Sequence, residues 1–148
     1  MSGQVTSVDI TSLAQYLEKV KDLSSINKMM GPTYLKYFIE GQDVAGSMLA
    51  KAVQSDIKAK AHLDKVESIA YLDKAADYLK ERGIKDSSEA RKRYVDVDPE
   101  VLEAKDHKAK TEALVHLLKS KLSVLRQSHD ALKKILYADQ SGTAWEGM

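Results

Sequence analysis

The sequence predicts an all-α protein in which two long helices form an elongated helical hairpin, accompanied by a short N-terminal helix. Charged residues make up 30% of the 148 positions and apolar residues 43%, with only two Pro and seven Gly to interrupt the chain. A sheet protein would contain more turn residues and more Val, Ile and aromatic residues. Apolar residues also recur at steps of three and four over long stretches, which is the spacing of one helix face.

The composition limits the classes of function. The 23 basic and 22 acidic side chains give a formal net charge of +1, so any electrostatic function must come from local clusters of charge. The absence of Cys excludes disulfides, thiolate nucleophiles and Cys-based metal sites. No apolar run approaches the roughly 18 residues of a membrane span, and the N-terminus does not have the pattern of a signal peptide. We therefore expect a soluble, cytoplasmic protein that has no membrane partner.

The N-terminal region, residues 1–31, is expected to hold one short helix and a loop. The helix should begin after Asp9, with Thr11 or Ser12 as its cap, because a side-chain oxygen at this position accepts a hydrogen bond from a free backbone N–H. A loop that ends at Gly31 separates it from the next helix. The apolar side of the short helix consists of Leu13, Tyr16, Leu17 and Val20.

The first long helix is predicted from about Thr33 to Arg82. Gly83 follows it, and Gly most easily takes the left-handed conformation that ends many helices. Within the helix, successive residues at alternating steps of three and four form a heptad-like seam. The seam consists of Leu35, Phe38, Gln42, Ala45, Leu49, Ala52, Asp56, Ala59, Leu63, Val66 and Ala70.

Some residues of this helix do not fit a simple apolar seam. Gln42 and Asp56 place polar groups in it, while Gly41 and Gly46 each cost about 1 kcal/mol relative to Ala in a helix interior. A second apolar stripe is expected to widen the buried face. It consists of Ile39, Val53 and Ile57.

A short helix is predicted to connect the two long ones. The spacing from Asp86 to Glu89 is that of a capping box, which predicts a helix that starts here and runs through Tyr94. Asp98 should then cap the last helix, with Pro99 in its first turn, where the missing N–H of Pro costs nothing.

The last helix is expected to reach about Tyr137. Residues 32–138 would thus form the long-helix core, which carries oligomerisation and DNA binding, and residues 139–148 would form a flexible C-terminal tail. A single elongated hairpin cannot hide broad apolar stripes, so we expect the chain to assemble into a homo-oligomer. The apolar side of the last helix consists of Ala109, Leu114, Leu117, Leu118, Leu125, Leu132 and Leu136.

No residue pattern predicts catalysis, a metal or a cofactor. The pairs Asp106–His107 and His129–Asp130 are adjacent in sequence, and neighbours on a helix point about 100° apart and cannot share a metal. The sequence contains no nucleophile elbow and no Gly-rich phosphate loop. We therefore expect a protein that is not an enzyme.

Two basic clusters are the candidate binding residues. One lies within two turns of the first long helix, and the other is the densest positive run of the chain and stands next to the ring of Tyr94, which could stack on a base. A groove lined by such residues tracks a phosphate backbone. The alternative is a solvated helix face with local pairs such as Lys108–Glu112. The candidate nucleic-acid-binding residues are Lys58, Lys60, His62, Lys65, Arg91, Lys92 and Arg93.

Several motifs resemble those of the UvsY-type recombination mediators of tailed phages. The segment Lys60-Ala61-His62-Leu63-Asp64 is similar to the Lys-Ala-Arg-Leu-Asp segment of that family. The resemblance spans roughly residues 35–137. In its C-terminal half the matching residues are Ser88-Glu89, the basic positions that follow, Asp98, Val101-Leu102 and Lys133-Lys134-Ile135.

The resemblance implies a ring-forming protein that binds single-stranded DNA and helps to load a RecA-like recombinase in the presence of a single-strand-binding protein. It also implies that the family's basic pair corresponds to Lys60 and His62, and that a phage-encoded chain works in the host cytoplasm. The main hypothesis is thus a phage recombination mediator. The alternative hypothesis is a non-enzymatic helical structural or adaptor protein, either a virion component or a regulator that binds another protein.

Overall fold

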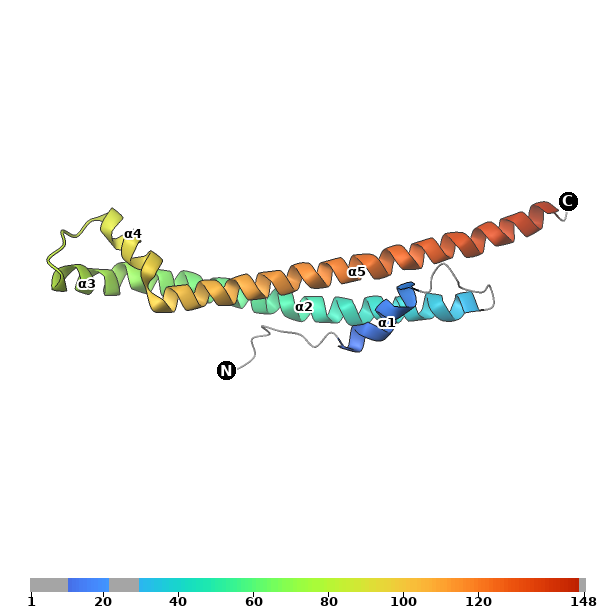
Figure 1. The fold of residues 1–148 in the computed structure, drawn as a ribbon, viewed down its shortest axis with the longest axis horizontal. Helices are drawn as coiled ribbons and strands as arrows, with labels where there is room; N and C mark the ends of the chain where they lie inside the picture. The colour runs from blue at the N-terminus through green and yellow to red at the C-terminus, as the bar shows by residue number, and fades with distance from the viewer. Residues whose placement is uncertain (1–10, 22–29, 147–148) are drawn as a thin grey trace. The chain divides into compact units, whose positions relative to one another are not determined.

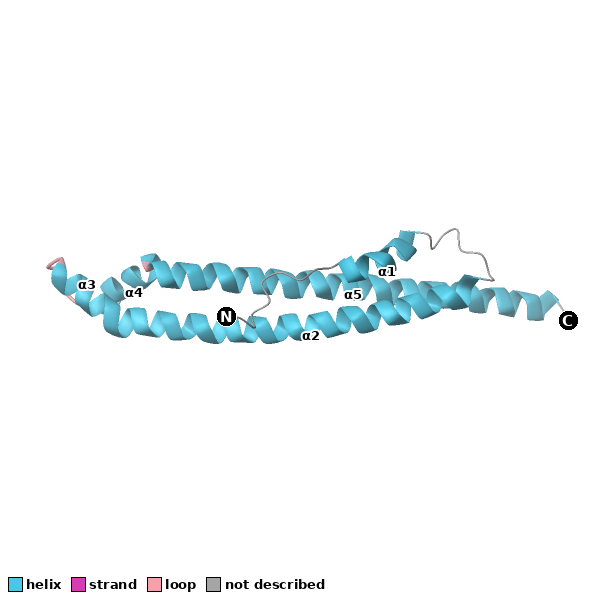
Figure 2. Cartoon of the chain, turned by 90° about the horizontal axis from the view of Figure 1, so that it is seen from below, coloured by secondary structure: helices cyan, strands magenta, loops and turns pink. Residues whose placement is uncertain are grey.

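The structure is a computed structural model that describes residues 11–21 and 30–146, with side chains through residue 138. In this part of the chain all regular structure is helical, as predicted (Figures 1 and 2). None of the described helices is both long enough and apolar enough to span a membrane. The elements are α1 (Thr11–Lys21), α2 (Gly31–Ile69), the π-helix η3 (Ala70–Lys74), α3 (Ala75–Glu81), α4 (Ser88–Val97) and α5 (Pro99–Glu146).

The described residues divide into two compact units. One comprises residues 51–115, and the second comprises residues 11–21, 30–50 and 116–146; α2 and α5 contribute to both. Helix α1 begins at Thr11, one of the two residues expected to cap it, and most of the predicted loop before Gly31 lies outside the described residues.

Within the 51–115 unit, the α2 and α5 segments run in opposite directions. Asp56 lies against Thr111, whereas Val66 and Ala70, further along α2, pack with Val101 near the start of α5. The predicted seam is confirmed at its buried positions, because Ala52, Ala59, Val66 and Ala70 are all buried. Small Ala residues leave room for the facing helix, so this seam brings the two backbones close.

The polar position in this seam has a specific partner. Asp56 is half-buried; its Oδ1 lies 2.8 Å from the hydroxyl of Thr111, which is fully buried, and 3.0 Å from Nζ of Lys108. The hydrogen bond to Asp56 raises the pKa of Lys108, which keeps the ammonium charged. A shift of one segment along the other would separate both Thr111 and Lys108 from Asp56, so these contacts favour one register of the two segments.

The expected second apolar stripe is only partly buried. Ile57 is 63% exposed and Val53 is half-buried in the 51–115 unit, and Ile39 is 50% exposed in the second unit. In the 51–115 unit one segment of α5 covers α2, and a single neighbouring helix covers one seam rather than two. Similarly, Leu114, Leu118, Leu125 and Leu132 of α5 are buried as predicted, whereas Ala109 and Leu117 are exposed.

The first long helix is helical to Glu81, but it is not a continuous α-helix. A π-helical turn, Ala70–Lys74, separates α2 from α3. The predicted end is confirmed: Gly83 has φ +65°, its N–H donates to Lys80 O at 3.2 Å, and the N–H of Ile84 donates to Leu79 O at 2.9 Å. These two bonds are those of a Schellman motif, which satisfies the last carbonyls of the helix.

The start of α4 differs from the prediction by one residue. Ser87, not Asp86, is the N-cap, and its hydroxyl accepts from the N–H of Ala90 at 3.1 Å. The carboxylate of Asp86 instead pairs with Arg91. The helix also continues past the predicted end at Tyr94 to Val97, because the next cap stands only at Asp98.

Asp98 caps α5 as predicted. Its Oδ1 accepts from the N–H groups of Glu100 at 2.9 Å and Val101 at 3.1 Å. Helix α5 runs to Glu146 rather than to about Tyr137. No Pro stands in this extension, and a Gly costs a helix only about 1 kcal/mol.

In the second unit, Gly41 is a site of close approach. A Cβ added at Gly41 would lie 2.9 Å from Cβ of Tyr16 and 3.2 Å from Cδ1 of Leu125, so α1 and α5 both pack against this point of α2. Leu13 and Tyr16 of α1 are buried, as expected from its apolar side.

Candidate nucleic-acid interface

One exposed face of α2 in the 51–115 unit carries basic side chains without partners. Lys58, His62 and Lys65 are exposed and, at separations of four and three, share this face. Lys51, seven residues before Lys58, lies on the same face and is also exposed. None of the four forms a hydrogen bond or an ion pair within the described part of the chain. We call Lys51, Lys58, His62 and Lys65 the basic flank.

Lys60 is exposed but does not belong to the basic flank. It lies two residues after Lys58, which is about 200° around the helix. The buried seam residue Ala59 lies between these two directions. The α2 residues predicted to bind nucleic acid therefore lie on two opposite sides of the seam.

Acidic residues border the basic flank at His62. A cavity of about 490 Å³ is lined by His62 of α2 and by Glu100, Glu103 and His107 of α5. Glu100 also pairs with Lys74 at 3.1 Å. The carboxylates weaken the attraction of a phosphate at this end, so the lysines rather than His62 provide most of the positive potential.

The same cavity does not form a metal centre. Nε2 of His107 is buried without a hydrogen-bond partner, yet in the described ranges no three His, Cys, Asp or Glu side chains are placed to hold one ion.

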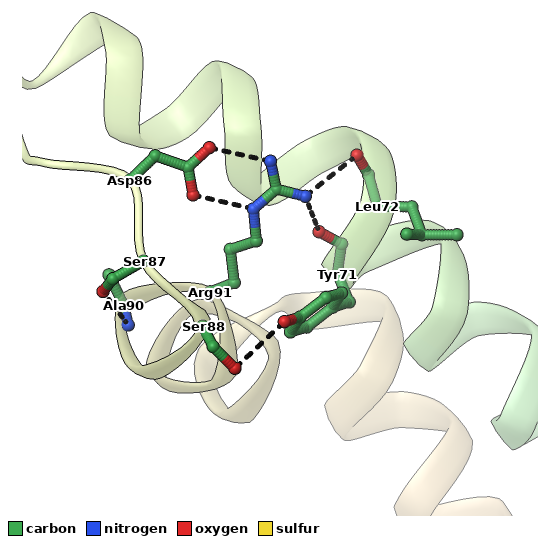
Figure 3. A network of polar contacts seen from close by, with 7 residues as sticks. All are labelled: Tyr71, Leu72, Asp86, Ser87, Ser88, Ala90 and Arg91. Carbon is green, nitrogen blue, oxygen red and sulfur yellow. Dashed lines mark hydrogen bonds and ion pairs between the residues drawn. The ribbon is translucent and has the colours of Figure 1, made fainter.

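Arg91 is the centre of a polar network that joins η3, the loop before α4 and α4 itself (Figure 3). Its Nε and Nη2 donate to the two carboxylate oxygens of Asp86, both at 2.8 Å. Its Nη1 donates to the carbonyl of Tyr71 at 3.1 Å and contacts that of Leu72 at 3.5 Å. The side chain is only 22% exposed. Most of its hydrogen-bonding capacity is thus used inside the unit.

The network connects the π-helical turn to α4. In this turn the N–H of Ala75 donates to the carbonyl of Ala70, which is the i→i+5 pattern of a π-helix. Arg91 donates to the carbonyl of Tyr71 and contacts that of Leu72 in the same turn, and the Tyr71 hydroxyl donates to Oγ of Ser88 at 3.1 Å. The hydrogen bonds from Arg91 lower the pKa of Asp86, so the pair remains charged at neutral pH.

The other two residues of the predicted basic run are more accessible. Lys92 is exposed and unpaired among the described residues. Arg93 is 78% exposed and forms an ion pair with Glu89 at 2.7 Å. An exposed pair of this kind contributes little to stability, so a phosphate can compete for the guanidinium at small cost.

The ring of Tyr94, expected to stand free for a base, is partly buried. Its hydroxyl donates to Oδ2 of Asp98 at 2.7 Å, and burial together with this bond raises its pKa to about 12. Lys74 also contacts the Asp98 carboxylate, at 3.6 Å. The ring lies 4.9 Å from that of Tyr78, centroid to centroid, so the two tyrosines join α3 to α4.

Lys51 is the candidate residue that the sequence prediction missed, although its spacing of seven from Lys58 would have identified it. Of the predicted residues, the structure brings Lys58, His62 and Lys65 onto one face, separates Lys60 from them, and uses Arg91 internally.

Comparison of the chain with protein-family models, with curated proteins and with solved structures finds no match.

Proposed function

We propose that this chain is a non-enzymatic, cytoplasmic protein that binds single-stranded DNA and serves as a recombination mediator. In this proposal the long helices pair as an elongated hairpin, and copies of the chain assemble into a ring-like homo-oligomer. The ring presents the DNA to a RecA-like recombinase in competition with a single-strand-binding protein. The identity of these two protein partners, and the phage context, follow from the resemblance of residues 35–137 alone.

The observation that supports DNA binding is the basic flank. Lys51, Lys58 and Lys65 are exposed and have no carboxylate partner among the described residues, although the chain contains almost as many acidic as basic residues. Their spacing of seven places them along one line of the helix, which matches a polyanion rather than a single anion. Repetition around an oligomer would extend this line into a longer track and raise the effective concentration of binding sites.

A binding titration tests this function. We expect a labelled single-stranded oligonucleotide to show a rise in fluorescence anisotropy at low salt that disappears at high salt, with an oligomer seen by light scattering. The double variant Lys58→Glu/Lys65→Glu should reduce the slope of log affinity against log salt by about 1.4, or about 0.7 for each phosphate contact.

A matched variant controls for net charge. Lys105 and Lys110 are exposed and pair with Asp96 and Asp106, so Lys105→Glu/Lys110→Glu makes the same charge change away from the basic flank. This control should retain most of the salt slope. Absence of binding by the unmodified protein at low salt would reject the function.

The second candidate is a helical structural or adaptor protein, and the exposed apolar residues favour it. Ile57 is 63%, Leu72 62% and Leu102 50% exposed in the 51–115 unit. Exposed apolar side chains mark an interface between proteins where they lie together in one patch. An oligomer that binds no oligonucleotide at any salt concentration would support this candidate.

A further inference from the structure

A cavity of about 470 Å³ lies between α3, the loop after it and α4. Its apolar lining comes from Tyr78 and Leu79 of α3, Ile84 of the loop, and Tyr94 and Val97 of α4. The charged residues Lys85, Glu89 and Arg93 also line it. Pockets that bind small ligands commonly measure about 300–1,000 Å³ and combine apolar walls with a few polar groups. This cavity has both properties.

The cavity is formed by a stretch of backbone that is fixed at several points. The Schellman bonds at Gly83 set the direction in which the chain leaves α3. The Ser87 cap fixes the start of α4. The two hydrogen bonds from Arg91 to Asp86 hold the loop before α4, and the bond from Arg91 to the Tyr71 carbonyl joins this loop to η3 (Figure 3). The cavity is thus preformed, which reduces the entropy that a ligand must overcome on binding.

The apolar residues at this cavity are not explained by folding. Val97 is 62% exposed and Ile84 is 47% exposed, although both line the same cavity as the buried Leu79. The aromatic groups already lie together, because the Arg82 guanidinium lies 4.4 Å from the centroid of the Tyr78 ring, and this ring neighbours that of Tyr94 at an interplanar angle of 41°. A flat ligand could extend this arrangement.

The charges at the cavity favour an anionic ligand, because two cations, Lys85 and Arg93, stand against the single carboxylate of Glu89. Lys85 is exposed and has no ion-pair partner among the described residues, and Arg93 is held only by the exposed Glu89. A flat ring joined to a phosphate is the unit of single-stranded DNA, in which bases stack on aromatic and guanidinium planes while cations bind the backbone.

We propose that the cavity between α3 and α4 binds one base of single-stranded DNA, with the adjoining phosphate at Lys85 and Arg93. This proposal rests on the proposed function and deepens it: the basic flank binds the backbone without regard to bases, whereas the cavity requires a base.

Oligonucleotides that lack bases separate the two sites. We compare a labelled oligothymidylate with one of the same length and charge in which abasic sites replace most nucleotides. Stacking of one base commonly contributes a factor of about ten in affinity, so the unmodified protein should bind the abasic strand about tenfold more weakly. Equal affinity for the two strands would overturn the base site and leave backbone binding intact.

Two variants assign the effect to the cavity. Val97→Glu places a carboxylate at an exposed position in the lining and should bind both strands with the same reduced affinity. Leu102→Glu makes the same kind of change at a residue that is 50% exposed and outside the lining, and should keep the tenfold difference.

Each outcome has one meaning. If Val97→Glu retains the difference between the strands, the base is bound elsewhere and the proposal is wrong. If the unmodified protein binds neither strand at low salt, the proposed function fails and the base site fails with it. Lys58→Glu/Lys65→Glu should weaken binding to both strands while preserving their ratio, which confirms that the two sites act separately.

Discussion

Arg91 donates two parallel hydrogen bonds of 2.8 Å to Asp86, and the same guanidinium contacts the carbonyls of Tyr71 and Leu72 in the π-helical turn. The planar fork of Arg matches a carboxylate in a way that the single ammonium of Lys does not. Arg91, the first residue of the densest basic run, therefore joins the loop before α4 to η3.

Replacement of this fork should destabilise the protein. Arg91→Lys keeps the charge but loses the bidentate contact and the hydrogen bond to the Tyr71 carbonyl, so we expect a fall of several degrees in the melting temperature. Arg93→Lys, two residues away and 78% exposed, is the matched control and should change it little. Circular dichroism melts measure both. Equal melting temperatures for the two variants would contradict the structural role of Arg91.

The buried cap of α5 should make stability depend on pH in the acid range. Burial of the Asp98 carboxyl raises its pKa, but hydrogen bonds from Tyr94 and from the N–H of Val101, together with the charge of Lys74, outweigh this and hold the pKa below the ordinary 3.8. A carboxyl with a lowered pKa in the folded state stabilises the protein above its ordinary pKa. This contribution is lost as the pH falls through the folded value.

Thermal unfolding from pH 7 to pH 2 can measure this dependence. Asp98→Asn still caps the helix but cannot titrate, so its stability should start lower at pH 7 and decline less steeply below pH 3.8 than that of the unmodified protein. Asp64→Asn removes an exposed carboxylate as a control and should follow the unmodified curve. If the stabilities of Asp98→Asn and of the unmodified protein decline equally steeply as the pH falls, another carboxyl controls acid unfolding.

The two interior glycines of α2 should respond to Ala with opposite signs. A Cβ at Gly46 meets nothing within 4 Å, so Gly46→Ala should stabilise the protein by about 0.5–1 kcal/mol through helix propensity. At Gly41 the same Cβ would lie 2.9 Å from Cβ of Tyr16, so Gly41→Ala should destabilise by about 1–3 kcal/mol through overpacking. Urea denaturation of both variants checks the sign, and stabilisation by both would show that α1 does not pack against Gly41.

Local patterns were sufficient to predict some elements and not others. The seam through Ala52, Ala59 and Val66 follows from spacing alone. The Asp98 cap follows from its carboxylate, which can accept from free N–H groups, and from the Pro directly after it. The link from the π-helical turn to α4 could not be predicted, because its donor, Arg91, stands 20 residues after Tyr71 in the chain. The carboxylate of Asp86 pairs with Arg91 instead of capping α4, so Ser87 is the cap although Asp86 fits the local pattern equally well.

The hydrogen bond of Thr111 should stabilise the 51–115 unit. Thr111→Val replaces the buried hydroxyl by a methyl group of similar shape, and the loss of its contact with Asp56 should cost about 1–2 kcal/mol. Lys108 stays in contact with Asp56, so the carboxylate does not become isolated. Urea denaturation measures the loss. A neutral or stabilising result would show that this polar pair does not help to hold the two segments in register.

The opposite directions of Lys58 and Lys60 separate Lys60 from the basic flank, although Lys60 and His62 form the basic pair implied by the family resemblance. If DNA follows the basic flank, Lys58→Glu should lower the salt slope of oligonucleotide binding by about 0.7, and Lys60→Glu should leave the slope nearly unchanged. The two variants change the same charge two residues apart on one exposed helix, so each controls for the other. Anisotropy titrations at several salt concentrations give both slopes. A larger effect at Lys60 than at Lys58 would place the DNA on the side of the seam that Lys60 faces.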